Sequence, residues 1–197
     1  GSSTRCRKRG GEMIKAYIDF KSLECFLALE PIIELAEEFG VSIDWQPFSS
    51  RPRALPTQVD DETVTQTHHR VRAESEHRLR HLYASVRGYK IPSDSATKNS
   101  TKALVRLNQI TGDRTAFVKQ AFETCWLENQ NLDDASLLDQ ICSSASAVYD
   151  PTKDDLEETQ AIAEKAGLFD APAFIIDGQL FMGRAHIPWM RELLQQG

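Results

Sequence analysis

The sequence predicts an α/β fold in which a small mixed sheet is interrupted by a block of helices. A strand, a helix and a strand occupy residues 13–48, and a hairpin of two short strands lies near the other end. Between them, from Ser49 to about Gly167, the pattern is helical and no convincing strand is found. Strand, helix and strand within about 35 residues predict a βαβ unit with parallel strands and a right-handed crossover.

The first unit is indicated by its periodicity. Apolar residues alternate with others from Met13 to Phe20, as expected for a strand, and a second strand is predicted from Val41 to Phe48. The helix between them is expected to begin at Ser22, a favourable N-cap, and to end at Gly40. Pro31 lies inside that helix and is expected to kink it.

The middle of the chain is predicted to be a helical insertion. Pro52 and Pro56 indicate a linker that leaves the sheet. A very polar helix is expected over residues 61–86, where its thin apolar stripe consists of Leu79, Leu82, Tyr83 and Val86. Further helices are expected after Ser100, around 117–126, around 137–142 and from Thr152 to Gly167, the last with a capping box to Asp155.

The C-terminal end returns to β structure. Ala173–Ile176 and Gln179–Met182 are predicted strands, and Asp177-Gly178 between them is typical of a type I′ hairpin turn. A closing helix is expected from Pro188. We therefore divide the chain into a discontinuous sheet domain (13–49 and 151–197), a helical insertion (50–150) and a disordered tail or cloning remnant (1–12).

Composition restricts the class of protein. The chain has 197 residues and a formal net charge of −6, which argues against a nucleic acid partner because phosphate binding needs a basic face. No apolar run approaches the roughly 20 residues of a membrane span. The four cysteines, at positions 6, 25, 125 and 142, show no CxxC spacing, and the first twelve residues lack a hydrophobic segment. A cytoplasmic protein with free thiols is expected.

The stretch Ser22-Leu23-Glu24-Cys25 is the strongest candidate for chemistry. Unpaired amides and the helix dipole favour an anion at a helix N-terminus, and residues three apart share a helix face. Ser22 and Cys25 are therefore predicted to be catalytic. The alternative from the residues alone is an ordinary N-cap beside a packed thiol.

The two ends of the chain resemble the DsbA-like thioredoxin superfamily. The resemblance rests on the βαβ unit, the helical insertion, and the ending Gly167–Phe174 followed by Asp177-Gly178 and Phe181-Met182-Gly183. Within the superfamily the chain looks most like the 2-hydroxychromene-2-carboxylate isomerases and the kappa-class glutathione transferases. This resemblance implies a thioredoxin-like fold, glutathione as the cofactor, a small, aromatic organic acid as the substrate, and a homodimer.

The resemblance also implies roles for individual residues. In this branch a serine replaces the first cysteine of the redox motif and contacts the glutathione sulfur, and Ser22 falls at this position. Pro172 matches the cis-proline of the family, and Ala171 before it would offer its backbone to the cysteinyl part of glutathione. Arg184 and Ala185 stand where glutathione users often carry a small polar residue and Asp. We expect Arg184 to meet a substrate carboxylate.

Two other functions compete with this hypothesis. The first is a monothiol oxidoreductase that uses Cys25, since a single motif cysteine cannot perform dithiol exchange. The second is a thioredoxin-fold protein that binds a partner or small molecule without catalysis, which Leu23, Arg184 and Ala185 favour as departures from the family pattern. A metal site at Glu74, His77 and His81 is not expected, because a charged, solvated helix explains these residues.

Overall fold

A computed structural model describes residues 12–51, 55–92 and 98–196. The predicted tail lies outside these residues except for Glu12. In chain order the elements are β1 (Met13–Ile18), α1 (Leu23–Phe39), β2 (Ser42–Pro47), α2 (Val64–Val86), α3 (Thr101–Gln109), β3 (Ile110–Thr111), α4 (Thr115–Trp126), α5 (Ala135–Ser144), β4 (Val148–Tyr149), α6 (Leu156–Lys165), β5 (Ala173–Ile176), β6 (Gln179–Met182), the short 3-10 helix η2 (Arg184–His186) and α7 (Ile187–Gln196).

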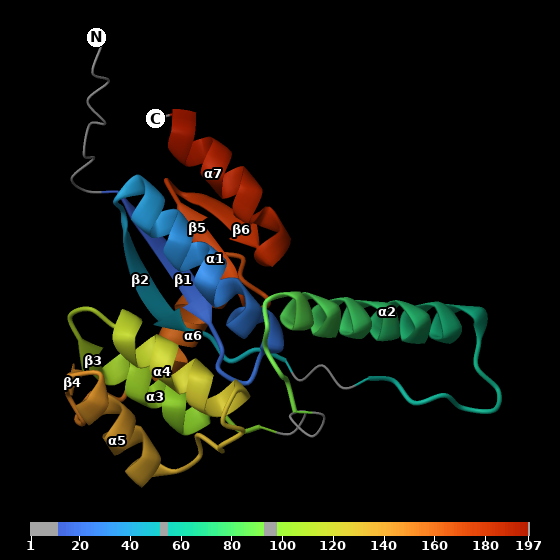
Figure 1. The fold of residues 1–197 in the computed structure, drawn as a ribbon, viewed down its shortest axis with the longest axis horizontal. Helices are drawn as coiled ribbons and strands as arrows, with labels where there is room; N and C mark the ends of the chain where they lie inside the picture. The colour runs from blue at the N-terminus through green and yellow to red at the C-terminus, as the bar shows by residue number, and fades with distance from the viewer. Residues whose placement is uncertain (1–11, 52–54, 93–97, 197) are drawn as a thin grey trace.

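The central sheet has four strands in the order β2-β1-β5-β6. The β1 and β2 strands are parallel, whereas β5 runs antiparallel to β1 and β6 antiparallel to β5. Helices α1 and α7 cover one face of the sheet and α6 lies against the other (Figure 1). The predicted α/β class with a helical insertion is therefore confirmed.

The ends of α1 and the β5–β6 turn follow from their sequences. Ser22 caps α1, and Gly40 follows the helix with φ 65°, so that its N–H bonds the carbonyls of Ala36 and Glu37. Asp177 and Gly178 both have positive φ, as a type I′ turn requires. The α1 helix continues through Pro31 without interruption.

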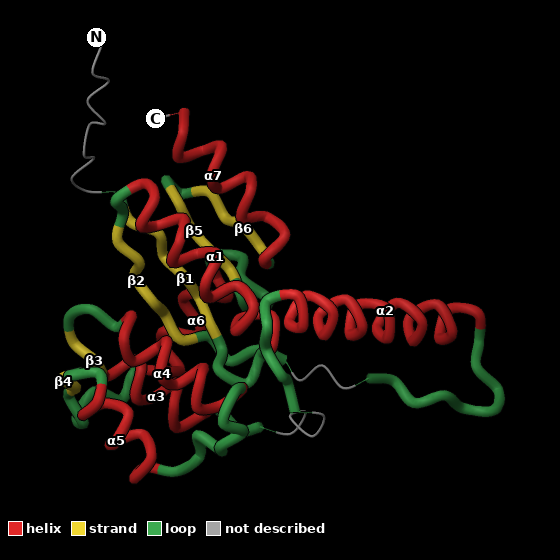
Figure 2. The backbone as a smooth tube through the Cα atoms, viewed as in Figure 1, coloured by secondary structure: helices red, strands yellow, loops and turns green. Residues whose placement is uncertain are grey.

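The insertion packs onto the sheet domain through aromatic side chains. Phe20, which follows β1, is fully buried. Its ring lies 4.9 Å from that of Phe122 and makes an edge contact with Phe117 at 6.0 Å between centroids. Helices α3, α4 and α5 gather below the sheet, while α2 projects away from the rest of the chain (Figure 2). The aromatic contacts place the turn after β1 at the junction of the two parts.

Three expectations differ from the structure. A two-stranded sheet of β3 and β4 lies within the insertion, and strands of two residues are too short to show an alternating pattern. Helix α6 begins at Leu156 rather than Thr152, with Asp155 as its N-cap residue. Tyr17 and Asp19, which alternate with the apolar residues of 13–20, are both buried, because residues of the insertion cover this end of the predicted strand. Within the described residues no helix is long and apolar enough to cross a membrane.

Candidate functional site

Ser22 lies at the junction of the β1 turn and α1. Its backbone is extended, and its Oγ accepts a hydrogen bond from the backbone N–H of Cys25 at 3.3 Å. A serine hydroxyl has one proton to donate besides its acceptor lone pairs. The cap bond uses only a lone pair, so the Ser22 hydroxyl keeps its proton. In this structure the hydroxyl favours the neighbouring Cys25 sulfur, and it would have to turn from that sulfur to bind a ligand at the helix mouth.

Asp19 is a buried carboxylate that sequence reasoning missed. Its Oδ2 accepts from both the backbone N–H and the Oγ of Ser50, each at 2.7 Å, and its Oδ1 accepts from the Ser100 Oγ at 2.5 Å. Lys21 adds its backbone N–H at 3.3 Å and its ammonium at 3.4 Å. Ser50 and Ser100 are distant in the chain, so only the position of a carboxylate at the end of a strand could have suggested its importance.

Cys25 is buried directly behind this turn. The thiol is 1% exposed, and its Sγ accepts a hydrogen bond from the Asp19 N–H at 3.4 Å. Burial raises the pKa of Cys25 far above its ordinary value, and the negative charges of Asp19 and Asp170 raise it further. Hydrogen bonds from Ser22 and Asp19 lower it by less. A neutral, inaccessible thiol is a poor nucleophile, which argues against the monothiol alternative.

The insertion holds the β1–α1 turn from the other side. The Trp126 Nε1–H donates to the Phe20 carbonyl at 2.8 Å, and the Cys125 thiol donates to the same oxygen at 3.5 Å. The sequence placed Trp126 only at the end of a helix predicted around 117–126, since nothing in the pattern shows a polar contact of an indole. The turn that presents Ser22 is thus fixed by groups from both parts of the chain.

The second edge of the site lies at the start of β5. The Ala171–Pro172 peptide bond is cis. The Pro172 carbonyl accepts from the Gly183 N–H at 2.9 Å, and the Asp170 Oδ1 accepts from the Ala171 N–H at 2.9 Å. The backbone donor expected to pair with glutathione is therefore engaged by the neighbouring side chain.

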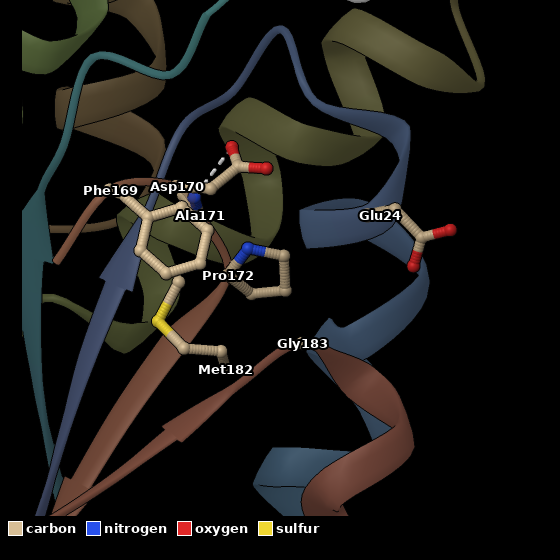
Figure 3. Close-up of a pocket in the computed structure, with 7 residues that line it drawn as sticks. All are labelled: Glu24, Phe169, Asp170, Ala171, Pro172, Met182 and Gly183. Atoms are coloured by element: carbon tan, nitrogen blue, oxygen red, sulfur yellow. Dashed lines mark hydrogen bonds between the residues drawn. The ribbon is translucent and has the colours of Figure 1, made fainter. Parts of the chain in front are cut away.

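A pocket of about 180 Å³ opens beside this edge. In Figure 3, Pro172 lies between Phe169 and Met182 on one side and Glu24 on the other. The phenyl ring of Phe169 is 70% exposed, so the apolar side of the pocket is open to a ligand. The lining residues are Glu24, Phe169, Asp170, Ala171, Pro172, Met182 and Gly183.

The predicted residues are only partly brought together. Ala171 and Pro172 line the pocket, whereas Ser22 and Cys25 do not, and the helix that begins after Ser22 contributes Glu24 instead. Arg184 approaches the pocket through Glu24. The catalytic roles of Ser22 and Cys25 and the ligand-binding roles of Ala171, Pro172 and Arg184 stay predictions.

Two guanidinium groups offset the charge of Glu24. Arg80 Nη1 lies 3.7 Å from Glu24 Oε1, and Arg184 Nε lies 3.8 Å from Glu24 Oε2. The Arg184 guanidinium also stacks 3.8 Å above the centre of the Tyr83 ring. The buried Arg184 Nε makes no hydrogen bond with any described residue. The Glu24 carboxylate, whose negative charge by itself would oppose a nearby thiolate, is consequently accompanied by positive charge.

The histidines of α2 pair with one another. The rings of His77 and His81 are 4.3 Å apart, and burial, with the charges of His81 and Arg80, lowers the pKa of His77. Glu74 binds Arg70 at 3.0 Å instead of approaching these rings. In the described part of the chain, no group of three or more His, Cys, Asp or Glu side chains could hold a metal.

A helix that starts at the end of the central strand, with a cis-proline loop at the neighbouring strand, defines a thioredoxin-like fold. The chain belongs to the DSBA-like thioredoxin domain family, whose model matches residues 13–195. The resemblance found in the sequence is thereby confirmed.

Solved structures give the same fold. The chain is similar to a 2-hydroxychromene-2-carboxylate isomerase, with a TM-score of 0.71 and 15% identity over 93% of this chain and 95% of that chain. It is also similar to a "probable DsbA oxidoreductase" from Streptomyces coelicolor, with a TM-score of 0.66 and 16% identity over 94% and 89% of the two chains. No curated protein sequence matches the chain. At 15% and 16% sequence identity, the similarity to these two structures shows a shared fold and nothing about activity.

Proposed function

We propose that this protein is a thioredoxin-fold isomerase or glutathione transferase in which Ser22 stabilises the thiolate of glutathione. The observation that carries the proposal is the N-cap geometry of Ser22, whose Oγ accepts from the Cys25 N–H at 3.3 Å. The cap bond does not use the hydroxyl proton, which would turn from the Cys25 sulfur to the sulfur anion of glutathione. The first-turn amides of α1 and the helix dipole favour the same negative charge.

The proposed substrate is a small aromatic or conjugated organic acid. The glutathione thiolate would add to an electrophilic carbon, forming a C–S bond, and the π electrons would move onto the conjugated carbonyl. In an isomerisation, bond rotation would follow, and the electrons would return to expel the same thiolate. Nothing is oxidised or reduced, so a second cysteine is not needed. The exposed Phe169 ring offers an apolar surface for the substrate.

The charges near the pocket suggest how glutathione would be oriented. Asp170 and Glu24 are carboxylates that line the pocket and would suit the γ-glutamyl ammonium group. The Ala171 N–H could pair with the cysteinyl carbonyl only if the Asp170 carboxylate turned aside, because it now holds that N–H. The pocket volume of about 180 Å³ is below the roughly 300–1,000 Å³ of typical ligand sites. Glutathione would therefore rest partly on the open surface.

A thermal-shift screen tests this function. Glutathione, its S-conjugates and aromatic carboxylates are added to the protein and to the Ser22→Ala variant. A ligand at 100 times its dissociation constant stabilises a protein by about 2.7 kcal/mol, which shifts the melting temperature measurably. We expect glutathione to stabilise the natural protein more than the variant. Equal shifts, or none for any of these compounds, contradict the proposal.

One observation favours a second candidate, a binding protein without catalysis. The Ala171 N–H is satisfied within the chain, and Arg184 is held by Glu24 and Tyr83. Such a protein would bind an aromatic carboxylate without turnover, and without any dependence on glutathione. Steady-state assays of conjugated acids with and without glutathione distinguish the two candidates.

A further inference from the structure

Helix α2 stands apart from the rest of the chain. It projects from the body, and only its C-terminal part adjoins α1 (Figure 1). Among its 23 residues Ala84 alone is buried. The contact with α1 is made by Arg87, which lies 3.3 Å from Glu30 and 3.8 Å from Glu34, and by the Arg80–Glu24 pair. Most helices in proteins are stabilised chiefly by packing an apolar face rather than by intrinsic helix propensity.

Five aliphatic side chains of α2 point away from the body. They are 47–79% exposed and comprise Val64, Val71, Leu79, Leu82 and Val86. With His68 and Ser75 they follow the spacing 4, 3, 4, 4, 3, 4, which is an eleven-residue repeat. A repeat of this length keeps its members on one face of a nearly straight helix. At 100° per residue, the buried Ala84 lies on the face of the helix opposite Ser75. The stripe that contains Ser75 therefore faces solvent.

This exposed stripe is symmetric about Ser75. Val64 and Val86 lie eleven residues before and after it, His68 and Leu82 lie seven, and Val71 and Leu79 lie four. In a two-fold interface each residue pair occurs twice, because residue i of one copy meets residue j of the other and j meets i. An antiparallel partner helix with Ser75 on the axis therefore places Val64 level with Val86 and Val71 level with Leu79, while Leu82 lies level with His68. The small Ser75 occurs where the two helices come closest.

The charges beside the stripe have the same symmetry. On one side of the stripe Arg72 would lie within two residues, about 3 Å along the axis, of Glu76 from the second copy. On the other side Arg78 would lie equally close to Glu74 of the second copy. The segments that flank α2 carry opposite charges: Asp60 to Glu62 precede the helix, and Arg87 and Lys90 follow it. In an antiparallel pair the acidic end of one copy would lie beside the basic end of the other.

We propose that α2 is a homodimer interface, in which two copies of this chain pair their α2 helices antiparallel around a two-fold axis at Ser75. The partner is a second copy rather than another protein, because both the apolar stripe and the charges beside it are self-complementary. This inference is independent of the proposed function, since α2 binds its partner through the face opposite Arg80.

The first test measures mass in solution. Sedimentation equilibrium should give twice the monomer mass for the natural chain, and the Val71→Glu/Leu79→Glu variant should be monomeric, with at least a tenfold weaker association. Ile162→Glu on α6 is the matched control, because Ile162 is also exposed, at 60%. Arg72→Glu should weaken the dimer, and Arg72→Glu/Glu76→Arg should restore it. A natural chain that is monomeric throughout, or a dimer unaffected by the α2 variants, overturns the proposal.

The second test locates the axis by cross-linking. Ser75→Cys and Ser85→Cys are made in a Cys6→Ser background and oxidised mildly. Ser75 would meet its own copy across the axis, whereas the two copies of Ser85 would be about 30 Å apart along it. Only the Ser75→Cys variant should form a disulfide-linked species of twice the mass on a non-reducing gel. Equal cross-linking of the two variants, or cross-linking of Ser85→Cys alone, contradicts this geometry.

Discussion

The turn before α1 and the helix α2 are stabilised in opposite ways. The turn consists of buried polar groups that satisfy one another: Asp19 is bonded by Ser50, Ser100 and Lys21, and the Phe20 carbonyl by Trp126. Helix α2 leaves its apolar stripe in solvent. The turn before α1 holds the Ser22 hydroxyl in a fixed position. Helix α2 instead exposes an apolar surface on which a second copy could bind. Substitutions in the two regions should therefore have different consequences.

Removal of the Asp19 carboxylate should have the largest effect on stability. In Asp19→Ala the N–H and O–H of Ser50 and the O–H of Ser100 lose their acceptor in a buried site. Each buried donor left without its acceptor costs about 1–3 kcal/mol, and three donors are left here. Urea unfolding should show this loss, whereas Asp60→Ala, at an exposed position, should change stability by less than about 0.5 kcal/mol. A loss below about 1 kcal/mol for Asp19→Ala means that the hydrogen bonds do not stabilise the turn.

Trp126→Phe should have a smaller effect with a defined cause. The substitution keeps an aromatic ring but removes the N–H that donates to the Phe20 carbonyl at 2.8 Å. Loss of a buried hydrogen bond of this kind costs about 1–3 kcal/mol. Trp189→Phe is the matched control, because Trp189 is 68% exposed. Comparable losses for the two variants in urea unfolding contradict an anchoring role for Trp126.

The buried Cys25 thiol should make stability fall at high pH. Its pKa in the folded chain is raised above the ordinary 9.0, so the unfolded chain releases this proton first. Stability from the neutral thiol is complete below pH 9 and is lost as the pH rises above it. We expect a loss of about 1.4 kcal/mol between pH 8 and pH 10. Cys25→Ala should remove this part of the slope in unfolding experiments. An unchanged slope contradicts the burial of a neutral thiol.

Ser22→Ala should destabilise the chain by only about 1 kcal/mol, the usual cost of losing an N-cap. Asp134→Ala is the matched control, since the Asp134 side chain caps α5 by accepting from the N–H groups of Ser136 and Leu137. The two variants should melt at similar temperatures in differential scanning calorimetry. If Ser22→Ala is far less stable than Asp134→Ala, loss of the cap alone cannot explain its effects.

Elements with a clear period or cap could be predicted from the sequence. The βαβ unit, the Gly40 helix end and the Asp177-Gly178 hairpin depend on local patterns, and the structure has all three. The Asp19 network could not be predicted, because its donors are distant in the chain and become neighbours only when the insertion packs on the sheet. The exposure of the α2 stripe was also hidden, since periodicity shows that a helix has an apolar face but not what covers it.

The same limit applies to the candidate site. A family resemblance predicts two halves for it, at Ser22 and Pro172, and of these the pocket includes Pro172. The contacts that decide ligand binding could not be predicted: Asp170 holds the Ala171 N–H, and Arg80 joins Arg184 at Glu24. These side chains reach their partners through tertiary packing.

The central claim is that the Ser22 hydroxyl, rather than the helix cap it also forms, binds the thiol of glutathione. Isothermal titration calorimetry of glutathione into the natural chain, Ser22→Ala and Asp134→Ala tests it most directly. The account predicts saturable binding to the natural chain and to Asp134→Ala, with at least a tenfold weaker affinity for Ser22→Ala. Absence of binding to the natural chain, or equal affinity in all three proteins, would contradict it.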